Sequence, residues 1–457
     1  MTIKLITFGC RLNTYESEVI KTFLQNNTEL NNYDIIIFNS CTVTSEAEKQ
    51  LRQAIRKERR SNPHAIIGVV GCAVQTNTDT YKKMDEIDFI FGNIDKMQEK
   101  NYDLLIPIIK EKIKHHNNCN CQECHCHEED ENEEIETPPY ISPISPLDFD
   151  DTNNNKAILV SNIFNPYILN PHPITGFEDK TRGFIQIQSG CNNHCTFCAT
   201  RLARGKSTSI PSQQIISQIN QLVSNGYNEI VLTGINITDY GTHSPENINL
   251  GKLLKKIIQE TDLQRIRLSS LDIAGINDDL KDILFNESRM MPHIHLSLQS
   301  GDNTILQRMA RRHTREQTIS FCQEITKYKQ NLAIGADLIA GFPTETDLMH
   351  QNTYNLIQEI NLVFGHIFPY SIRENTPASL MPQVPVELRR QRAKSLRTLT
   401  TSQLQSFTQS QLNIPHQILI ENSTTGRTEN YLTINLPPHI TTNHKIGDII
   451  TIIPNDL

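Results

Sequence analysis

The sequence lacks any apolar run of the roughly 20 residues that a membrane-spanning helix requires. Its opening stretch, MTIKLITFGC, lacks the basic start and the small-residue cleavage site of a secretory signal peptide. The chain also shows no Ser–His–Asp set and no paired carboxylates that stand out as acid–base machinery. These absences predict a cytoplasmic protein that is not bound to a membrane, and they favour chemistry carried by cofactors.

Lysine and arginine are missing from one long segment. Residues 117–155 contain eleven acidic residues and no Lys or Arg, and without them the net charge of the chain changes from −8 to +3. The remainder carries basic clusters at residues 49–60, 308–315 and 389–397. Such clusters can bind nucleic-acid phosphates, but each one also fits an ordinary solvated helix face.

Strand-like and helix-like stretches alternate over residues 1–114. The apolar runs KLITF, YDIIIF, AIIGVV and IDFIFG predict four buried strands, and amphipathic stretches between them predict helices. Asn13, followed by Glu16, is expected to cap the first helix. Because strands separated by helices form parallel sheets, we expect an N-terminal α/β domain.

The rest of the chain divides into three parts. Residues 115–176 are polar, acidic and proline-rich, and are expected to form an insertion and linker. Residues 177–405 contain about six strand–helix repeats, which fit a partial (β/α) barrel with its chemistry at the carboxyl ends of the strands. Residues 406–457 show short alternating strands around Gly and Pro turns, which predict a small all-β barrel of a kind that often binds RNA. The predicted fold class is therefore α/β.

Three cysteines lie close together in the stretch SGCNNHCTFCATRLARG. Cys191, Cys195 and Cys198 have the spacing C-x3-C-x2-C and follow a predicted strand. A structural zinc site needs four ligands, and His194 has an awkward spacing for the fourth. A four-iron cluster held by three thiolates leaves one iron open to a small chelating ligand. The spacing therefore predicts an iron–sulfur cluster, with Phe197 shielding one side of its loop.

Three other cysteines are dispersed along the first domain. Cys10, Cys41 and Cys72 each come just after a predicted strand. Because the carboxyl ends of parallel strands share one edge of a sheet, these thiols are expected to converge there. Gly9 and Gly71 would let the backbone approach an anionic cluster closely. The alternative is three separate buried thiols.

Taken together and in this order, the two cysteine sets resemble the methylthiotransferase family of the radical S-adenosylmethionine (SAM) superfamily. The matching stretches are FGCRLNTYESE, NSCTVTSEAE, GVVGCAVQ, SGCNNHCTFC, LSLQSGDNTILQRMARRHT and DLIAGFPTET. The resemblance implies a radical SAM barrel, a C-terminal TRAM-like RNA-binding domain, SAM and two [4Fe–4S] clusters. Cys191, Cys195 and Cys198 would hold the cluster that binds SAM. The dispersed trio would hold an auxiliary cluster from which a methylated sulfur is donated.

The resemblance also implies residues of the SAM pocket. Gly234 and Asn236 follow the second barrel strand, where members of the superfamily contact the SAM amino group. Ser269, Gln299 and Asp337 lie at later predicted strand ends and are expected to line the pocket. Each of the five also fits a structural role. The segment after Cys198 lacks the family's frequent Ile-Pro pair.

Within the family, CRLNTYESE and GRTENY most resemble the branch that acts on threonylcarbamoyladenosine next to the anticodon of tRNA. Branches that act on isopentenyladenosine or on an aspartate of a ribosomal protein remain alternatives. A non-catalytic iron–sulfur protein that binds RNA or senses redox state is a further alternative. The implied partners are tRNA and a reducing electron donor such as flavodoxin or ferredoxin, and a monomer is expected.

The stretch CNCQECHCH departs from the family pattern. Four thiols and two imidazoles stand together there: Cys119, Cys121, Cys124, Cys126, His125 and His127. Such a set can hold zinc or another soft metal. The alternative is a biased insertion that scavenges metal incidentally.

Overall fold

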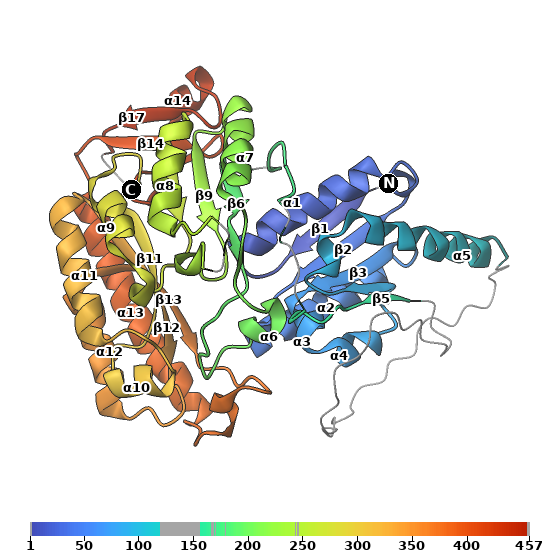
Figure 1. Ribbon diagram of the computed structural model, residues 1–457, viewed down its shortest axis with the longest axis horizontal. Helices are drawn as coiled ribbons and strands as arrows, with labels where there is room; N and C mark the ends of the chain where they lie inside the picture. Colours follow the sequence, from blue (N-terminus) through green and yellow to red (C-terminus); the bar gives the residue numbers. More distant parts are fainter. Residues whose placement is uncertain are drawn as a thin grey trace. The chain divides into compact units, whose positions relative to one another are not determined.

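The computed structural model describes residues 2–118, 156–165, 169, 171–178, 180–242, 244 and 246–454 (Figure 1). The chain folds into two compact units. The first comprises Met1–Phe8, Ile20–Cys41 and Ala47–Pro166, and the second comprises Gly9–Val19, Thr42–Glu46 and Tyr167–Leu457. The four cysteines and two histidines of CNCQECHCH lie outside the described residues. Within the described part of the chain, no helix has the length and apolarity to cross a membrane.

A five-stranded parallel sheet forms the centre of the first unit, with the order β1-β2-β3-β4-β5. Its strands are β1 (Ile3–Thr7), β2 (Ile35–Ser40), β3 (Ile66–Gly71), β4 (Phe89–Phe91) and β5 (Ala157–Leu159). Every residue of β2 and β3 is buried, as is typical of parallel strands covered on both faces. The predicted N-terminal α/β sheet is confirmed.

Strand β5 corrects the prediction of a linker over residues 115–176. It pairs in parallel with β4, with Phe89 opposite Ala157 and Phe91 opposite Leu159. Helix α5 (Leu105–Asn118) also runs past the predicted domain end at residue 114. A strand of three residues is too short to show a periodic pattern, so pairing with β4 decides its conformation.

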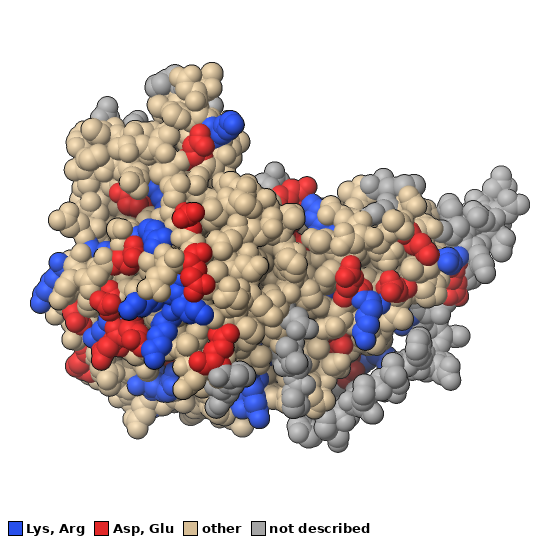
Figure 2. Space-filling view, turned by 45° about the horizontal axis from the view of Figure 1, so that its top comes forward, with Lys and Arg blue, Asp and Glu red and all other residues tan. Residues whose placement is uncertain are grey.

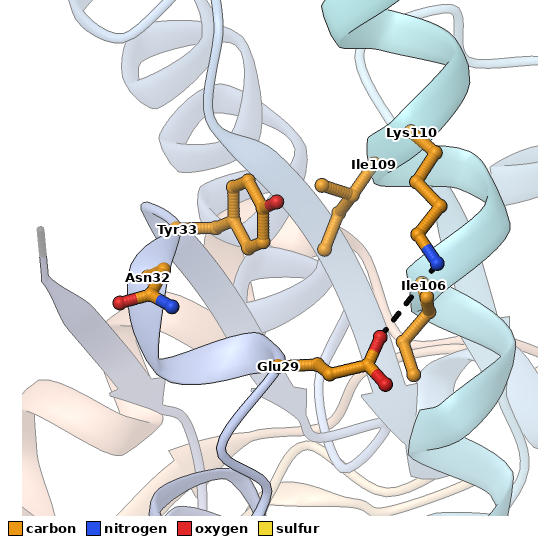
Figure 3. A pocket seen from close by; sticks show the side chains of 6 residues that line it. All are labelled: Glu29, Asn32, Tyr33, Ile106, Ile109 and Lys110. Atoms are coloured by element: carbon orange, nitrogen blue, oxygen red, sulfur yellow. Dashed lines mark ion pairs between the residues drawn. The ribbon is translucent and has the colours of Figure 1, made fainter.

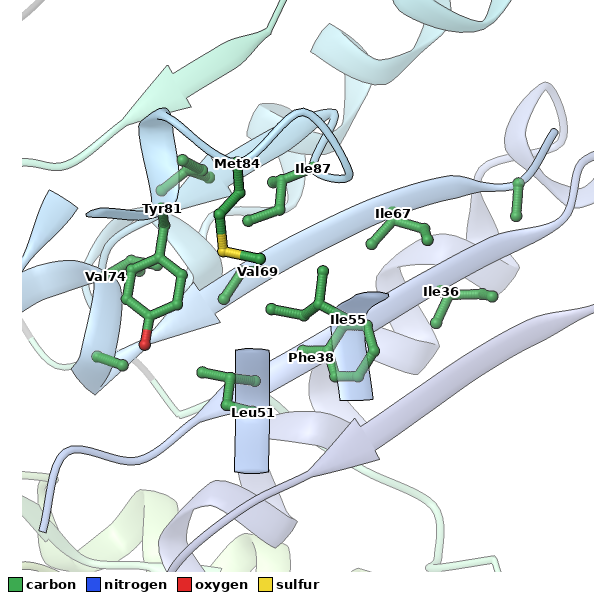
Figure 4. Close-up of a cluster of buried hydrophobic side chains, with 13 residues drawn as sticks. Ile36, Phe38, Leu51, Ile55, Ile67, Val69, Val74, Tyr81, Met84 and Ile87 are labelled. Atoms are coloured by element: carbon green, nitrogen blue, oxygen red, sulfur yellow. The ribbon is translucent and has the colours of Figure 1, made fainter. Parts of the chain in front are cut away.

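The helices around this sheet bury apolar side chains against it. They are α1 (Arg11–Asn26), α2 (Ser45–Ser61), α3 (Cys72–Thr76), α4 (Thr78–Lys82) and α5, with short 3-10 turns at Leu30–Asn32, Asp95–Met97 and Glu99–Leu104. Figure 4 shows one core, in which Leu51 and Ile55 of α2 pack near Phe38 of β2 and Val69 of β3. All four side chains are almost completely buried. Burial of this apolar surface holds α2 on the sheet.

Six parallel strands form the centre of the second unit. One sheet has the order β6-β9-β10 and the other β11-β12-β13. The strands are β6 (Arg182–Gln186), β9 (Glu229–Thr233), β10 (Arg265–Leu268), β11 (His293–Gln299), β12 (Ala333–Ala340) and β13 (Leu362–Pro369). Isolated parallel bridges, Ile266 to Met290 and Leu271 to Leu296, connect the two sheets. The six strands are the predicted partial (β/α) barrel.

Helices alternate with these strands and lie outside them (Figure 1). The longer ones are α7 (Ser212–Ser224), α8 (Leu250–Glu260), α9 (Asp278–Asn286), α11 (Arg315–Tyr328), α12 (Asp347–Glu359) and α13 (Val386–Ser410). Shorter elements near the carboxyl ends of the strands are β7 (Gln188–Ser189), α6 (Thr200–Arg204), β8 (Thr208–Ser209) and α10 (Asn303–Arg308), with 3-10 turns at Ile237–Asp239, Ile273–Gly275 and Pro377–Leu380. The loops that carry most of the predicted site residues leave these strand ends.

The C-terminal part of the second unit is an antiparallel sheet with the order β16-β15-β14-β17. It consists of β14 (His416–Ile420), β15 (Thr425–Thr428), β16 (Thr433–Asn435) and β17 (Ile449–Ile452), with helix α14 (Pro438–Asn443) before the last strand. The predicted strands are present, but helix α14 lies among them, so this part of the chain is not all-β. Helix α13 continues to Ser410, past the predicted start of the domain at residue 406. The described strands form an open sheet, in which β16 and β17 are the two edges.

Candidate functional site

The loop between β7 and α6 carries Cys191, Cys195 and Cys198. All three thiols are partly buried. The backbone N–H of Cys191 donates to the carbonyl oxygen of Gly205 (3.1 Å), and that of Cys198 donates to the carbonyl oxygen of Cys195 (3.2 Å). These bonds curl the loop back on itself beside the end of α6.

Gly190 makes this loop possible. Its φ is +73°, in the left-handed region that favours glycine. A Cβ atom at this position would lie 2.0 Å from the carbonyl oxygen of Lys206. Glycine is therefore required for the backbone to turn from β7 into the cysteine loop.

The three thiols interact electrostatically and fit an iron–sulfur cluster better than zinc. Burial raises the pKa of Cys191 to about 11, and negative charge on Cys198 or Cys195 raises it further. Three thiolates in such a place need a strongly positive partner. Among the described residues, no group containing these thiols brings three ligand atoms close enough to share a single ion. A four-iron cluster, which takes one thiolate on each of three irons, suits the wider spacing.

Arg311, three residues after the end of α10, supports the cysteine loop. Its Nη1 donates to the sulfur of Cys195 (3.5 Å), and its Nη2 donates to Oδ1 of Asp272 (3.0 Å) and to the carbonyl oxygen of Ser297 (2.7 Å). The other carboxylate oxygen of Asp272 accepts from Nδ2 of Asn193 on the loop (3.0 Å). Burial raises the pKa of Cys195, and the guanidinium of Arg311 lowers it in part. Arg311 and Asp272 thus position the loop and place positive charge at a thiol.

Sequence reasoning missed this role. The sequence places Arg311 only in the basic cluster at residues 308–315, and it gives no signal for Asp272. The four arginines of RMARRHTR show that a basic segment exists but not which arginine turns inward.

Two of the predicted SAM-pocket residues present unsatisfied polar atoms at neighbouring strand ends. Asn236, after β9, and Ser269, after β10, are both buried. Nδ2 of Asn236 and Oγ of Ser269 have no hydrogen-bond partner within the described structure. Buried polar groups are nearly always paired, so these two atoms are suited to a ligand. Gln188 shapes the same region, because its Oε1 accepts from the backbone N–H groups of Ile235 and Asn236 (3.0 Å each).

The other predicted pocket residues are placed as follows. A Cβ atom on Gly234 would lie 2.8 Å from both the carbonyl oxygen and Oε1 of Gln188, so close packing explains this glycine. Gln299 ends β11 with a φ of +68°. Phe197 lies edge-on to Phe342, with ring centroids 6.5 Å apart, and packs on an apolar cluster.

Asp337 requires a correction. The sequence placed it at a strand end, but it lies inside β12, which continues to Ala340. The strand continues for three residues after Asp337, and the Gly-Phe-Pro turn begins only at Gly341. The carboxylate of Asp337 faces two histidines, His295 and His366.

Two cysteines of the dispersed trio lie in the first unit. Cys41 directly follows β2 and Cys72 directly follows β3, and both are buried. The parallel register pairs Ser40 with Gly71, so the chain leaves the two strands at the same level. The two thiols therefore start from one edge of the sheet, as predicted. Cys10, three residues after the end of β1, belongs to the second unit, and its convergence with the other two stays a prediction.

The environment of Cys72 contains a buried cation. Gly71 has a φ of +101°, and a Cβ atom there would lie 2.8 Å from Oδ1 of Asn39 and 3.2 Å from Nζ of Lys96. Nζ of Lys96, a fully buried residue, donates to the same oxygen of Asn39 (3.0 Å). Nδ2 of Asn93 donates to the sulfur of Cys72 (3.5 Å). The amide donor of Asn93 at this sulfur, with a buried lysine bonded nearby to Asn39, suits an anionic cluster.

The predicted helix cap at Asn13 is wrong. Helix α1 begins at Arg11, so Asn13 and Glu16 lie inside it. Their side chains accept hydrogen bonds from the guanidinium of Arg204. The thiol of Cys10 also donates to Oδ1 of Asn13 (3.8 Å). Asn13 and Glu16 therefore pair with Arg204, which is distant in the sequence, and do not cap the start of the helix.

The basic segment at residues 389–397 is neither a phosphate-binding surface nor a solvated face along its whole length. Arg389 and Arg392 are buried. Arg389 donates to the carbonyl oxygen of Val384 (2.6 Å), and Arg392 donates to the carboxylate of Glu345 (2.9 Å). On the face shown in Figure 2, the exposed Lys and Arg side chains are interspersed with Asp and Glu. Much of the basic charge therefore has a structural role.

A small pocket in the first unit contains none of the predicted site residues (Figure 3). The side chains that line it are Glu29, Asn32, Tyr33, Ile106, Ile109 and Lys110. Glu29 and Lys110 form an exposed ion pair across it, with 3.7 Å between Oε2 and Nζ. Such exposed pairs contribute little to stability or binding.

Comparison with known proteins places these features in a family. Residues 185–357 match the radical SAM superfamily, and residues 2–92 match the uncharacterized protein family UPF0004. The chain is 40% identical over 439 residues to "Threonylcarbamoyladenosine tRNA methylthiotransferase MtaB" of Rickettsia prowazekii (strain Madrid E), covering 96% of this chain and 92% of that protein. This chain belongs to the MtaB methylthiotransferase family.

The chain is also similar to other relatives and to a solved structure. The MtaB protein of Aquifex aeolicus (strain VF5) is 32% identical over 83% of this chain and 82% of its own. A "tRNA-2-methylthio-N(6)-dimethylallyladenosine synthase" of Finegoldia magna is 28% identical over 83% of this chain and 74% of its own. The radical SAM methyltransferase TsrM of Kitasatospora setae matches with a TM-score of 0.53 and 12% identity, covering 83% of this chain and 77% of that one, which supports the fold.

MtaB membership confirms several predictions from the sequence. The chain is a radical SAM enzyme, not a non-catalytic iron–sulfur protein, and the cofactors of the family are SAM and [4Fe–4S] clusters. Both cysteine sets fall inside matched segments, the dispersed trio in residues 2–92 and the C-x3-C-x2-C loop in residues 185–357.

Proposed function

We propose that this protein transfers a methylthio group to C2 of threonylcarbamoyladenosine next to the anticodon of tRNA. The observation that carries the proposal is the 40% identity to the Rickettsia MtaB protein over nearly the full length of both chains. The isopentenyladenosine branch is less well supported, because the dimethylallyladenosine synthase is 28% identical and matches over a smaller part of both chains.

Cys191, Cys195 and Cys198 would hold one [4Fe–4S] cluster, with its open iron available to SAM. When bound, the cluster and SAM supply the radical that activates the C–H bond. The chain's own residues hold the cysteine loop in place through Arg311 and Asp272. Nδ2 of Asn236 and Oγ of Ser269 offer polar partners to SAM at neighbouring strand ends. Gly234, Gln299 and Phe197 would shape the pocket around it.

Cys10, Cys41 and Cys72 would hold the second cluster, from which the sulfur is donated. The amide of Asn93 donates to the sulfur of Cys72, and the buried Lys96 donates to Asn39 nearby, so both would support a cluster held there. Asp337 fits the substrate side of the barrel better than the SAM pocket, since its neighbours are polar histidines.

The partners are proposed on the same basis. A tRNA partner follows from the tRNA methylthiotransferases that the chain resembles. We propose that the C-terminal antiparallel sheet contacts this tRNA, that flavodoxin or ferredoxin supplies electrons, and that the protein is a cytoplasmic monomer. Size-exclusion chromatography with light scattering tests the monomer.

The decisive test is mass spectrometry of tRNA nucleosides from a strain that lacks the gene. The methylthio form of threonylcarbamoyladenosine should disappear, and plasmid-borne wild-type protein should restore it, whereas the Cys195→Ala variant should not. If the methylthio form of isopentenyladenosine disappears and the threonylcarbamoyl form persists, the proposed substrate is wrong.

A further inference from the structure

Three adjacent barrel strands bring two imidazoles and a carboxylate together. Nε2 of His295 on β11 lies 3.2 Å from Oδ1 of Asp337 on β12, and Nδ1 of His366 on β13 lies 3.4 Å from the same oxygen. The ligand atoms of all three lie within 4.8 Å of one another. We call these residues the His–Asp–His cluster.

The backbone of the barrel is built around this cluster. The parallel register places Asp337 directly opposite His366. Gly335, two residues before Asp337, is needed because a Cβ atom there would lie 2.7 Å from Nδ1 of His295. The side chain of His295 is 9% exposed, that of Asp337 28% and that of His366 60%. The cluster therefore runs from the interior of the barrel to a surface that solvent or substrate can reach.

A short segment connects the cluster with the cysteine loop. Oγ of Ser270, just after β10, lies 3.4 Å from Oδ2 of Asp337. Two residues further along the chain, Asp272 bonds to Arg311, which contacts the sulfur of Cys195. A nucleoside at the carboxyl ends of the barrel strands would lie near both the cluster and the radical source.

The His–Asp–His cluster can both donate and accept hydrogen bonds. Burial raises the pKa of Asp337, but hydrogen bonds from His295 and His366 hold it below its ordinary value, so the carboxylate stays ionised. An ionised carboxylate accepts hydrogen bonds, and an imidazole can donate one or pair with an anion. A threonylcarbamoyl group presents a carboxylate, a hydroxyl and N–H groups. An isopentenyl group is a hydrocarbon, which would remove these polar side chains from water without replacing their hydrogen bonds.

We propose that the His–Asp–His cluster binds the threonylcarbamoyl group of the substrate and selects it over the isopentenyl group. This inference rests on the proposed function and deepens it. His366 binds the carboxylate of the substrate, because it is the more exposed of the two histidines. Asp337 accepts a hydrogen bond from a hydroxyl or N–H group of the substrate. His295 holds Asp337 in place from the interior.

The test measures binding with anticodon stem-loops that carry threonylcarbamoyladenosine, isopentenyladenosine or adenosine at the same position. Fluorescence anisotropy with reconstituted protein gives the three dissociation constants. Wild type should prefer the threonylcarbamoyl stem-loop. His366→Phe should lower that preference about tenfold, the loss expected for one hydrogen bond to a charged group. His366→Gln, which keeps a hydrogen-bond donor, should restore part of it.

Controls separate a specific effect from damage to the fold. His64→Phe makes the same change at an exposed position of the first unit and should leave the preference unchanged. Circular dichroism and iron content should be equal in wild type and His366→Phe, which shows that the fold and the clusters are intact.

The outcomes are distinguishable. If wild type methylthiolates threonylcarbamoyl tRNA and His366→Phe keeps the full preference, the inference is overturned and the proposed function stands. If wild type acts only on isopentenyl tRNA, the proposed function itself fails.

Elemental analysis tests whether the cluster holds a metal, since two histidines and a carboxylate also suit zinc or another divalent ion. A stoichiometric ion other than iron that is lost in His366→Phe, with the binding preference retained, would assign the cluster to a metal.

Discussion

Arg204 and Glu16, 188 residues apart in the sequence, form a buried ion pair inside the second unit. Each side chain is 2% exposed. Nη2 of Arg204 also lies 2.6 Å from Oδ1 of Asn13 and 3.0 Å from Oε2 of Glu16. Arg204 ends the helix after Cys198, and Glu16 lies in the helix after Cys10, so this pair joins segments that carry cysteines of both sets.

Removing one partner of this pair should be costly. We expect Arg204→Ala to lower the free energy of unfolding by about 3 kcal/mol, because Glu16 would stay buried without its counter-ion. Urea unfolding of the apoprotein measures this. Arg390→Ala is a matched control, since its pair with Glu387 is exposed, and it should change stability by less than about 0.5 kcal/mol. Equal losses in both variants would show that burial of the Arg204 pair has no special effect.

Cysteine variants should separate the two clusters. Cys195→Ala should abolish release of 5′-deoxyadenosine and leave the iron of the second cluster bound. Cys41→Ala should leave SAM cleavage intact and end methylthio transfer, because its thiol belongs to the dispersed trio. Iron content and deoxyadenosine assays check both variants. Identical phenotypes would contradict separate roles for the two sets.

Loss of the arginine at the cysteine loop should weaken the radical site. Arg311→Met removes a hydrogen bond and a positive charge from Cys195 but keeps a side chain of similar length. Changes in residues that support metal ligands typically lower activity or affinity about 10- to 100-fold. SAM cleavage should fall accordingly, and the reduction potential of the cluster, followed by EPR, should become more negative. Arg315→Met, which breaks the outer pair with Glu359, should change neither.

His313 should make stability depend on pH. Burial lowers its pKa to about 4, and the guanidinium of Arg311 contributes to the shift. Between the unfolded pKa of about 6.5 and the folded value, the unfolded chain binds more protons, so stability falls as pH falls through this range. Lowering the pH from 7.5 to 5 should therefore lower the free energy of unfolding of the wild type by about 2 kcal/mol. Urea unfolding of wild type and His313→Gln at pH 7.5 and 5 measures the difference, and parallel pH dependence in the two proteins would refute the assignment.

The acidic insertion should be dispensable, but the strand after it should not. Replacing residues 119–155 with a Gly/Ser linker should preserve methylthio transfer, because β5 and α5 remain. Extending the replacement through Leu159 removes β5 from the sheet and should lower the melting temperature. Complete loss of activity in the first variant would mean that the insertion does more than connect two elements.

Local patterns in the sequence predicted most of the elements near the site. Cysteine spacing identified the loop at Cys191, because a cluster needs closely spaced thiolates and the spacing is visible along the chain. Alternating strands and helices identified the parallel sheet and the partial barrel, because the period of apolar residues is a local property. The placement of Cys41 and Cys72 after β2 and β3 followed from the same rule, since parallel strands end at one edge.

Other features of the site were decided by the tertiary structure. Asn13 and Glu16 have the pattern of a helix cap, but both accept hydrogen bonds from Arg204. Arg311 is one of several basic residues in its segment, and the fold brings it to the sulfur of Cys195.

The amino-acid sequence by itself determined most of the strands and helices, the close spacing of Cys191, Cys195 and Cys198, and the repeats of the barrel. Only the tertiary structure decided which polar side chains face each other, as His295, Asp337 and His366 do across three strands. The physical reason is that a buried charge must find a partner wherever the fold brings one within hydrogen-bonding distance, and that distance is independent of separation along the chain.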